Sequence, residues 1–342
     1  MPRSTRIDID LGAILHNAKV LRAVAGDKHV MAVVKADAYG HGAVPVATHI
    51  EGAVDAFAVA LIEEAVTLRD ADVTKPILVL EGPHCAADLA LCVHLNIWPT
   101  LHRADQLAWC HALTEKPAQV WLKIDTGMHR LGFQPAQAQS ISQRLRADGI
   151  KTVVAMSHLA AAETPDSDLS VAQKTTWNAT TTSWEGETSL HNSAATRLAT
   201  PARSVWARIG YALYGGQIEG LEPNARLKPA MTLASSVLAT RRIAQGDSVG
   251  YGGRWTAGRD SVIATVPVGY GDGYPWGAAD GTPVGINGQI APLAGRVSMD
   301  MVTVDVTDCA SVSLGAPAVL WGDQPSIDDV AAHSSTIGYE LM

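Results

Sequence analysis

The sequence is short of cysteine, of positive charge and of long apolar runs, and each shortage excludes a class of protein. Four cysteines in 342 residues are too few for a disulfide framework. Lys and Arg total 26 against 34 Asp and Glu, and the resulting charge of −8 disfavours a nucleic-acid surface. No stretch approaches the roughly 20 apolar residues of a membrane span, and the N-terminus has no apolar signal segment. We therefore expect a cytoplasmic protein without nucleic-acid or membrane partners.

The few cysteines do not form a metal-binding pattern either. Three of them lie near histidines, but no Cys-x-x-Cys spacing occurs, which argues against zinc. Cys85 and Cys92 are seven residues apart, on one face of a predicted helix. Free cysteine behaves as a small apolar side chain. We predict buried, inert thiols and no metal site.

What the sequence does contain is an alternation of short apolar runs with Ala- and Leu-rich helical stretches. Apolar residues make up 47% of the chain, enough for about two domains. A helix over Leu11–Ala25, with Asp10 as its cap and Gly26 at its end, precedes the alternation. Eight units of this kind predict a parallel (β/α)8 barrel of the TIM type. The predicted strands are Val30–Val34, Ala56–Leu61, Pro76–Leu80, Asn96–Leu101, Gln119–Ile124, Thr152–Ser157, Thr188–His191 and Val205–Ile209.

The pattern changes after Pro229 to alternating strands with Gly-rich turns, and helical patterns all but vanish. Asn287-Gly288 predicts a hairpin, because a type I′ turn needs positive φ at both central residues. We expect a barrel over 1–229 and a mainly β domain over 230–342, and leave open whether the first few residues join the latter. The strands expected in it are Met231–Ile243, Val262–Val268, Val284–Ala291 and Met301–Val306.

Polar residues follow five of the eight predicted strands, at the ends where a barrel places its active site. They are Lys35, then Lys123 with Asp125, then His158, then Asn192 with Ser193, then Arg208 with Gly210. Surface charge would scatter over both barrel faces, so the clustering favours function.

Lys35 follows the apolar run Val30–Val34, which partly desolvates its amine and is expected to lower its pKa. Such an amine is suited to nucleophilic attack and to a Schiff base. An ion pair with Asp37 explains the same lysine equally well. The residues taken alone leave these two interpretations open.

The segment Lys35-Ala36-Asp37-Ala38-Tyr39-Gly40-His41-Gly42 resembles the cofactor-lysine signature of the alanine racemase family. This resemblance implies a barrel plus a β domain, pyridoxal 5′-phosphate as cofactor, and interconversion of L- and D-alanine for cell-wall peptidoglycan. It covers nearly the whole chain, since similar blocks follow in order at 123–133, 157–158, 191–195, 208–216, 250–257, 269–275, 295–300 and 338–341.

The resemblance assigns two proton-transferring bases, Lys35 and Tyr251. Racemisation needs both, because a single base would mostly return the proton to the face it came from. A phenol needs roughly 4 kcal/mol of phenolate stabilisation to act near pH 7, which calls for a cationic neighbour. The resemblance suggests His158 as that partner. Packing of Tyr251 and a structural hydrogen bond of His158 are the alternatives.

The resemblance also assigns the residues that hold the cofactor. Arg208 would face the pyridine nitrogen and leave it unprotonated, whereas a salt bridge at the barrel rim is its other interpretation. Asn192 either supports the phosphate site or caps the next helix. The phosphate donors would be Tyr39, Ser193, Tyr339 and the backbone amides of Gly210 and Tyr211, the last two opening a short helix.

The substrate carboxylate would be bound by Arg130 and the backbone amide of Met299. Lys123 corresponds to a lysine that family members can carry carbamylated, as a negative partner for Arg130. In this family Tyr251 and Met299 reach the site from a partner subunit, which implies a homodimer with shared active sites. Sequence periodicity does not show this independently.

Two departures and three rival functions remain at this point. Family members normally continue past Tyr339, whereas the sequence ends at Met342, and Ser298 stands where cysteine is common. A serine or other small amino acid racemase would have the same motifs. A related decarboxylase would place an acid where Arg208 stands. A non-catalytic pyridoxal phosphate carrier would leave the segment after Pro229 without a purpose.

Overall fold

The structure is a computed structural model that describes residues 4–197, 202–217 and 226–342, in two compact units. One unit is Ile14–Leu227, and the other combines Met1–Ala13 with Lys228–Met342. The boundary near the N-terminus falls inside the first helix, α1 (Leu11–Ala25). The chain therefore contributes its first strand to the unit formed by its C-terminal third.

The first unit is built on eight parallel strands, and the barrel predicted from the sequence is confirmed. Their order in the sheet is β8-β7-β6-β5-β4-β3-β2-β9, and a parallel bridge between His191 and Ala207 joins the two end strands. The bounds are β2 His29–Val33, β3 Ala56–Val59, β4 Ile77–Val79, β5 Ile97–Leu101, β6 Gln119–Lys123, β7 Thr152–Met156, β8 Thr188–Ser189 and β9 Trp206–Ile209. All eight predicted strands are present, mostly shortened by one or two residues.

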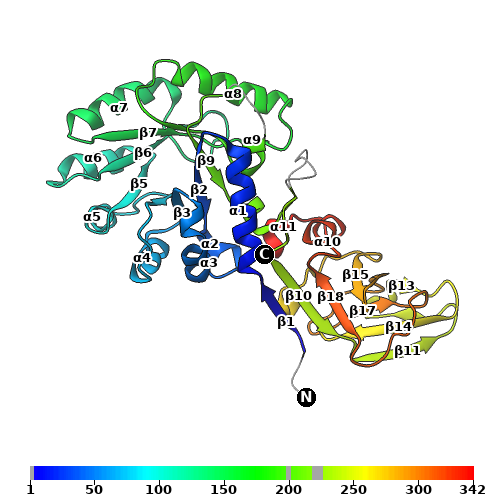
Figure 1. The fold of residues 1–342 in the computed structure, drawn as a ribbon. Helices are drawn as coiled ribbons and strands as arrows, with labels where there is room; N and C mark the ends of the chain where they lie inside the picture. The colour runs from blue at the N-terminus through cyan, green and yellow to red at the C-terminus, as the bar shows by residue number, and fades with distance from the viewer. Residues whose placement is uncertain (1–3, 198–201, 218–225) are drawn as a thin grey trace. The chain divides into compact units, whose positions relative to one another are not determined.

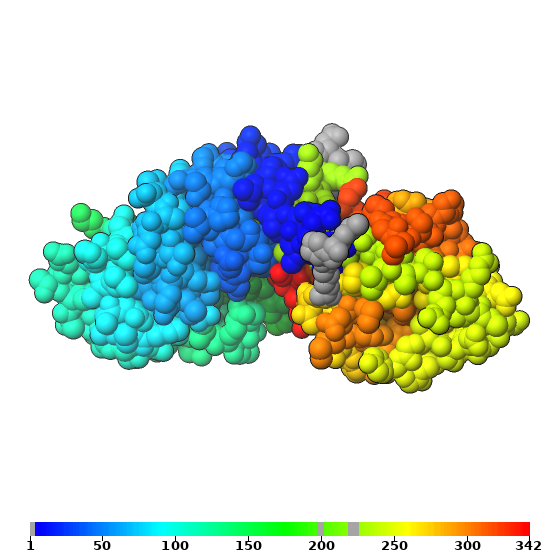
Figure 2. All heavy atoms as spheres, turned by 90° about the horizontal axis from the view of Figure 1, so that it is seen from below, coloured from blue at the N-terminus to red at the C-terminus, as the bar shows by residue number. Residues whose placement is uncertain are grey.

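Helices lie outside these strands (Figure 1) and bury the faces that point away from the barrel axis. A strand that is covered on both faces has a continuous apolar sequence. β3 is an example, since all four of its residues are apolar and buried. In Figure 2 the segments from α4 to α6, blue to cyan, form much of the face of this unit that is in view. The helices are α3 Ala43–Ile50, α4 Ile62–Asp70, α5 Ala86–His94, α6 Ala104–Ala112, α7 Ala138–Ala147, α8 Asp168–Thr181 and α9 Ser193–Arg197, with short 3-10 turns η1 Glu51–Ala53, η2 Pro135–Gln137 and η3 Tyr211–Tyr214.

The predicted leading helix is confirmed at both ends as α1. The Asp10 carboxylate accepts a hydrogen bond from the Ala13 N–H at 2.9 Å, which satisfies one donor of the first turn. Gly26 follows the helix with a positive φ of 62°, a conformation that glycine adopts without strain.

The second unit contains antiparallel sheets around its own apolar core. A five-stranded sheet has the order β1-β10-β18-β15-β16, a three-stranded sheet β11-β14-β17, and β12 pairs with β13. The predicted hairpin is confirmed, since Asn287 and Gly288 both have positive φ between β15 and β16. The strands are β1 Arg6–Ile9, β10 Met231–Ser236, β11 Ala239–Ile243, β12 Ser248–Val249, β13 Trp255–Thr256, β14 Ser261–Val266, β15 Pro283–Ile286, β16 Gln289–Pro292, β17 Val302–Asp305 and β18 Pro317–Trp321, with 3-10 turns η5 Tyr251–Gly253 and η6 Tyr270–Asp272.

Two details of this unit differ from the prediction, and one question that the sequence left open is answered. Met231–Ile243 is two strands rather than one, because Val237 turns inward between them and each half joins a different sheet. Two short helices, α10 (Ile327–His333) and α11 (Gly338–Leu341), close the chain. The first residues, whose place the sequence left open, join this unit, since β1 pairs antiparallel with β10.

The prediction that all cysteines are buried is wrong for Cys85, which is exposed at the start of α5, and Cys309 is only partly buried. Burial raises the pKa of Cys92 to about 12 and that of Cys110 to about 11, so these two thiols are unreactive. Across the described ranges, no group of metal-binding side chains comes together. No helix among those residues is long and apolar enough to cross a membrane.

Candidate active site

The five strands whose ends carry polar residues are neighbours in the closed barrel. Lys123 ends β6, His158 follows β7, Ser193 follows β8, Arg208 lies on β9 and Lys35 follows β2. In the sheet order these strands are consecutive, because the bridge between His191 and Ala207 joins β8 to β9 and β9 pairs with β2. Parallel strands end at the same rim, so these side chains gather on one half of the barrel mouth.

Lys35 opens a turn with an unusual backbone, α2 (Lys35–Tyr39). The four residues Ala36–Tyr39 all have φ between 51° and 56°, which makes a short left-handed turn without glycine. Each such residue costs roughly 1–2 kcal/mol relative to the right-handed form. Strain of this size concentrates at functional sites, where the surrounding structure has to hold it.

Side chains on both sides hold this turn in place. The Glu64 carboxylate accepts from the Ala36 N–H at 2.5 Å, and the Asp37 carboxylate accepts from the Ala43 N–H at 2.6 Å. The buried His41 ring places Nδ1 within 3.0 Å of the Ala38 carbonyl oxygen. Asp37 therefore acts within the turn rather than as the ion-pair partner that was the alternative for Lys35, and Lys35 itself is half-buried at the mouth.

Arg208 is 4% exposed and surrounded by neutral acceptors. Its Nη1 donates to the Ser189 carbonyl oxygen at 3.0 Å and to Ser189 Oγ at 2.5 Å, and Nη2 donates to the Ser157 carbonyl oxygen at 2.7 Å. Burial lowers its pKa to about 10, which still leaves it cationic at neutral pH. The rim salt bridge proposed as its alternative role is not seen among the described residues, since no carboxylate of theirs pairs with Arg208.

His158 lies directly against that cation, with Nδ1 3.2 Å from Arg208 Nη2. A guanidinium can only donate, so Nδ1 accepts and the ring proton sits on Nε2. Burial, followed by the charges of Arg208 and Lys123, holds the pKa of His158 well below its usual value. The expectation of a cationic histidine is therefore wrong for this arrangement: His158 is a neutral donor, and the positive charge beside it belongs to Arg208.

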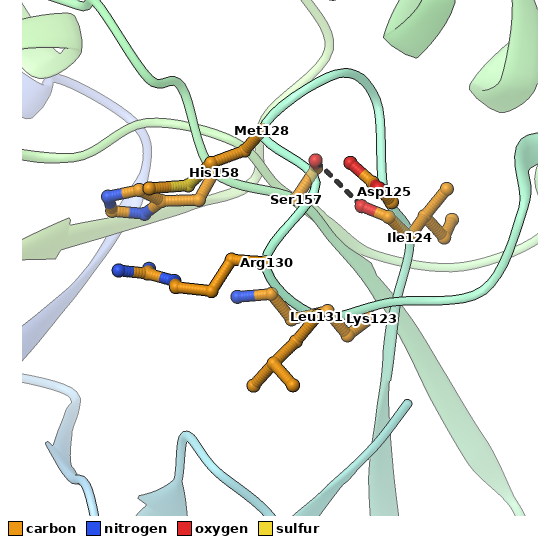
Figure 3. A pocket seen from close by; sticks show the side chains of 8 residues that line it. All are labelled: Lys123, Ile124, Asp125, Met128, Arg130, Leu131, Ser157 and His158. Atoms are coloured by element: carbon orange, nitrogen blue, oxygen red, sulfur yellow. Dashed lines mark hydrogen bonds between the residues drawn. The ribbon is translucent and has the colours of Figure 1, made fainter. Parts of the chain in front are cut away.

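Lys123 and Arg130 face a pocket beside His158 (Figure 3), and the nitrogen-bearing ends of the three side chains point into the same space. Lys123 is 8% exposed. Burial, then the charges of Arg208, Arg130 and Lys35, lower its pKa to about 7. Within the described ranges, the side chains of Lys123 and Arg130 form no ion pair or hydrogen bond with a protein group. The pocket thus concentrates positive charge that the protein leaves unbalanced.

The loop that carries Arg130 is pinned at its base. The N–H of Asp125 donates to the Phe133 carbonyl oxygen and the N–H of Phe133 to the Lys123 carbonyl oxygen, both at 2.9 Å. The Asp125 carboxylate accepts from the N–H groups of Gly127 and His129 at 3.0 Å, and these bonds lower its pKa. Asp125 therefore organises the loop, and its charge is directed to loop donors rather than to Arg130.

A second group of donors lies around Gly210. The Gly210 N–H donates to Ser193 Oγ at 3.0 Å, and a Cβ on Gly210 would come within 2.7 Å of the Tyr39 hydroxyl oxygen. Burial raises the pKa of Tyr39 to about 12, so its phenol keeps the proton. The short helix expected at Tyr211 is present as η3. Two hydroxyls beside a glycine backbone fit a phosphate group.

Asn192 takes the helix-capping role that was one of its two interpretations. Its Oδ1 accepts from the Ala195 N–H at 2.9 Å at the start of α9. The cap fixes the turn on which Ser193 is presented.

The other three predicted residues lie in the second unit, on exposed positions. Tyr251 is 71% exposed in η5, Met299 55% and Tyr339 43%. Gly250, Gly252 and Gly253 all have positive φ, which lets the chain turn sharply on both sides of Tyr251. The structure of a single barrel unit therefore brings together the lysines, arginines and His158, but not these three side chains.

Three buried polar residues of the site have no counterpart in the sequence analysis: Ser189, Thr126 and Gln173. Ser189 binds Arg208, whereas Gln173 in α8 contacts the loops after β6 and β7. Only Gln173 could have been found from the sequence. It is a polar residue on the buried stripe of a helix, with Trp177 and Thr181 four and eight residues further on.

Comparisons with known proteins agree on one family. The family described as "Alanine racemase, N-terminal domain" matches residues 9–218, and "Alanine racemase, C-terminal domain" matches residues 230–342. An alanine racemase of Alteromonas mediterranea is 43% identical over 100% of this chain and 96% of its own length.

Solved structures agree as well. The biosynthetic alanine racemase of Pseudomonas aeruginosa superposes with a TM-score of 0.93 at 40% identity, covering 99% of this chain and 96% of its own. The alanine racemase of Bartonella henselae, described with covalently bound pyridoxal phosphate, has a TM-score of 0.89 at 29% identity, covering 99% and 96%.

Replacing Ala36 by glycine should relieve the left-handed turn. Glycine adopts positive φ without a steric penalty, so we expect Ala36→Gly to be neutral or to stabilise by about 1 kcal/mol. The matched control, Ala90→Gly on the exposed face of α5, should destabilise by about 1 kcal/mol. Urea unfolding of both variants measures the difference, and equal losses would contradict a strained turn.

The depressed pKa of Lys123 predicts a pH-dependent stability. Because the folded value is about 7 and the unfolded value about 10.4, the folded chain binds fewer protons between these limits, so stability rises with pH there. Lys123→Met removes this dependence. The free energy of unfolding of the Lys123→Met variant, relative to that of wild type, should therefore fall by about 1.4 kcal/mol per pH unit between pH 7 and 9. Denaturant titrations of ligand-free protein without bicarbonate test this, and a pH-independent difference would refute it.

Proposed function

Because the chain belongs to the alanine racemase family, we propose that it interconverts L- and D-alanine with pyridoxal 5′-phosphate as cofactor. The observation that carries the proposal is the unbalanced positive charge at the barrel mouth. In the part of the chain that the structure describes, no carboxylate forms an ion pair with Lys35, Lys123 or Arg130, Asp125 is the acid that lines their pocket, and the acceptors bonded to Arg208 are neutral. Such a site is completed by anionic ligands, and a phosphate together with an amino acid carboxylate supplies them.

The residues at the mouth fit this cofactor. Lys35 would hold it covalently, Tyr39, Ser193 and the amides at Gly210 and Tyr211 would bind its phosphate, and Arg208 would face its ring nitrogen. When bound, pyridoxal phosphate supplies an electron sink that makes the α-proton of an amino acid acidic. An arginine that remains cationic leaves the ring nitrogen unprotonated, which disfavours competing reactions such as transamination.

Two groups of the protein then move the α-proton. Lys35 Nζ takes or returns it on one face of the substrate, and the Tyr251 hydroxyl does so on the other. His158 supports the second step as a neutral donor, because its Nε2 carries a proton while Nδ1 accepts from Arg208. The charge that stabilises the phenolate comes from Arg208 and is transmitted through the polarised imidazole ring.

Arg130 is the proposed carboxylate ligand, assisted by the Met299 N–H. Its guanidinium faces the pocket without a protein partner in the described part of the chain, and a planar fork suits a carboxylate. Carbamylation of Lys123 fits its surroundings, since an amine with a pKa of about 7 is largely neutral above that pH and three cations surround it. The modification would turn a repelled cation into an anion beside Arg130.

We propose a homodimer in which the partner subunit supplies Tyr251 and Met299. Support comes from the predicted site residues Tyr251 and Met299, which are exposed on the second unit together with other large apolar side chains. The others include Tyr270, Trp276 and Tyr339. The proposed role is supply of D-alanine for peptidoglycan in the cytoplasm of a bacterium. A broader racemase acting on serine is the second candidate, and a coupled D-amino-acid assay over several substrates separates the two.

Tyr251→Phe should abolish racemisation and leave the cofactor bound. Losing one proton-transferring group lowers the rate by about 10²–10⁴-fold. Lys35→Ala should instead lose the covalent cofactor absorbance as well as activity. Polarimetry and an absorbance spectrum of each variant measure this, and a fully active Tyr251→Phe would end the two-base proposal.

Mixed dimers test whether Tyr251 acts in the partner's site. In a heterodimer of Lys35→Ala with Tyr251→Phe, one site carries both defects and the other carries none. Random assortment at equal amounts should restore about a quarter of wild-type activity from two inactive parents. If both groups came from the same chain, refolding the mixture would restore nothing.

A further inference from the structure

Gln173 is a buried amide for which neither the sequence nor the proposed reaction assigns a role. It lies in the middle of α8 and is 0% exposed. Burying an amide is unfavourable unless its hydrogen bonds are met inside the protein. A side chain of this kind is retained where it joins segments that have to keep a fixed geometry.

All the contacts of the Gln173 amide go to the two loops that carry the site. Oε1 accepts from the Ala160 N–H at 2.8 Å, and Nε2 donates to the His158 carbonyl oxygen at 3.0 Å. Nε2 also lies 3.4 Å from Thr126 Oγ1. A backbone donor and a backbone acceptor fix which end of the amide is which. One side chain thus joins the backbone of His158 and Ala160 to Thr126, in the loop that leads to Arg130.

From Thr126 the hydrogen bonds continue as a directed chain. Ser157 Oγ donates its only proton to the Ile124 carbonyl oxygen at 2.8 Å, so Thr126 must donate to Ser157 Oγ, also at 2.8 Å. Thr126 is then left to accept from Gln173. The carbonyl oxygen of Ser157 accepts from Arg208 at 2.7 Å. The network therefore runs from α8 to the backbone that holds both His158 and the buried guanidinium.

We propose that Gln173 is a positioning residue for the racemase reaction, which sets the imidazole of His158 against Arg208 and fixes the loop that presents Arg130. The inference rests on the proposed function and goes beyond it, because Gln173 touches neither substrate nor cofactor. Its side chain also packs against the loop, since a Cβ on Gly127 would lie 3.3 Å from Gln173 Cγ.

Gln173→Met keeps the size of the side chain and removes its hydrogen bonds. His158 then loses its fixed place beside Arg208, so the phenolate of the second base loses its hydrogen-bonded donor. We expect kcat/KM for alanine to fall about tenfold and the rising limb of its pH profile to move about one unit to higher pH. Both changes correspond to the free energy of about one hydrogen bond.

Gln106 provides a matched control in the same barrel. It is also 0% exposed, accepts from the His102 N–H at 2.8 Å and donates to the Pro83 carbonyl oxygen at 2.9 Å. It joins the loops after β4 and β5, which carry none of the proposed site residues. Gln106→Met should lower the melting temperature about as much as Gln173→Met and leave the pH profile in place.

Gln173→Glu gives a second, independent readout. A protonated carboxyl can still accept from Ala160 and donate to the His158 carbonyl oxygen, whereas the ionised form has no donor. The activity of this variant relative to wild type should therefore be highest at low pH and fall as the introduced carboxyl ionises. Gln106→Glu should show a pH-independent ratio.

Thr126 keeps the inference testable if Gln173→Met does not fold. Thr126→Val breaks the chain from Gln173 to Ser157, and Thr126→Ser retains the hydroxyl. The valine variant should shift the pH profile in the same direction as Gln173→Met, and the serine variant should restore it.

The outcomes separate this inference from the function on which it rests. A wild-type protein that binds pyridoxal phosphate but does not racemise alanine would overturn the proposed function. An active wild type whose Gln173 and Gln106 variants differ in neither pH profile nor kcat/KM would overturn the positioning role alone.

Discussion

The arrangement at the barrel mouth depends on one buried cation. Arg208 is held by neutral acceptors of Ser157 and Ser189, so its charge remains uncompensated. In a site shielded from water, that charge acts strongly on its neighbours. It joins burial in lowering the pKa of both His158 and Lys123. The protonation of the site follows from burial together with this guanidinium and the cations around it, and these charges create its demand for anions.

The other segments of the site fix the positions of the reacting groups relative to Arg208. A strained left-handed turn presents Lys35, a pinned loop presents Arg130, and a hydrogen-bond chain from α8 steadies the backbone around His158. Each device lies just beyond a strand end, on loops anchored to a rigid barrel. This placement explains why the positioning groups are mostly buried and neutral, whereas the groups that face the pocket are charged.

Local sequence patterns predicted much of this architecture. The eight strands, α1 with its Asp10 cap, and the Asn287-Gly288 hairpin depend on nearest neighbours, and each is found where its pattern predicts it. The Lys35 segment indicated the chemistry through its resemblance to a family. The errors lie where distant segments decide, as when Met231–Ile243 divides between two sheets.

By itself, the sequence determined which residues end the strands and which chemistry they carry, because periodicity and side-chain type are local properties. Only the tertiary structure decided which of those strands are neighbours, since the last barrel strand, β9, pairs with the first, β2, and a bridge between His191 and Ala207 joins β8 to β9. It also decided that His158 is neutral and that Gln173 belongs to the site. Protonation and hydrogen bonding depend on burial and on the distance between side chains, and the folded chain alone sets both.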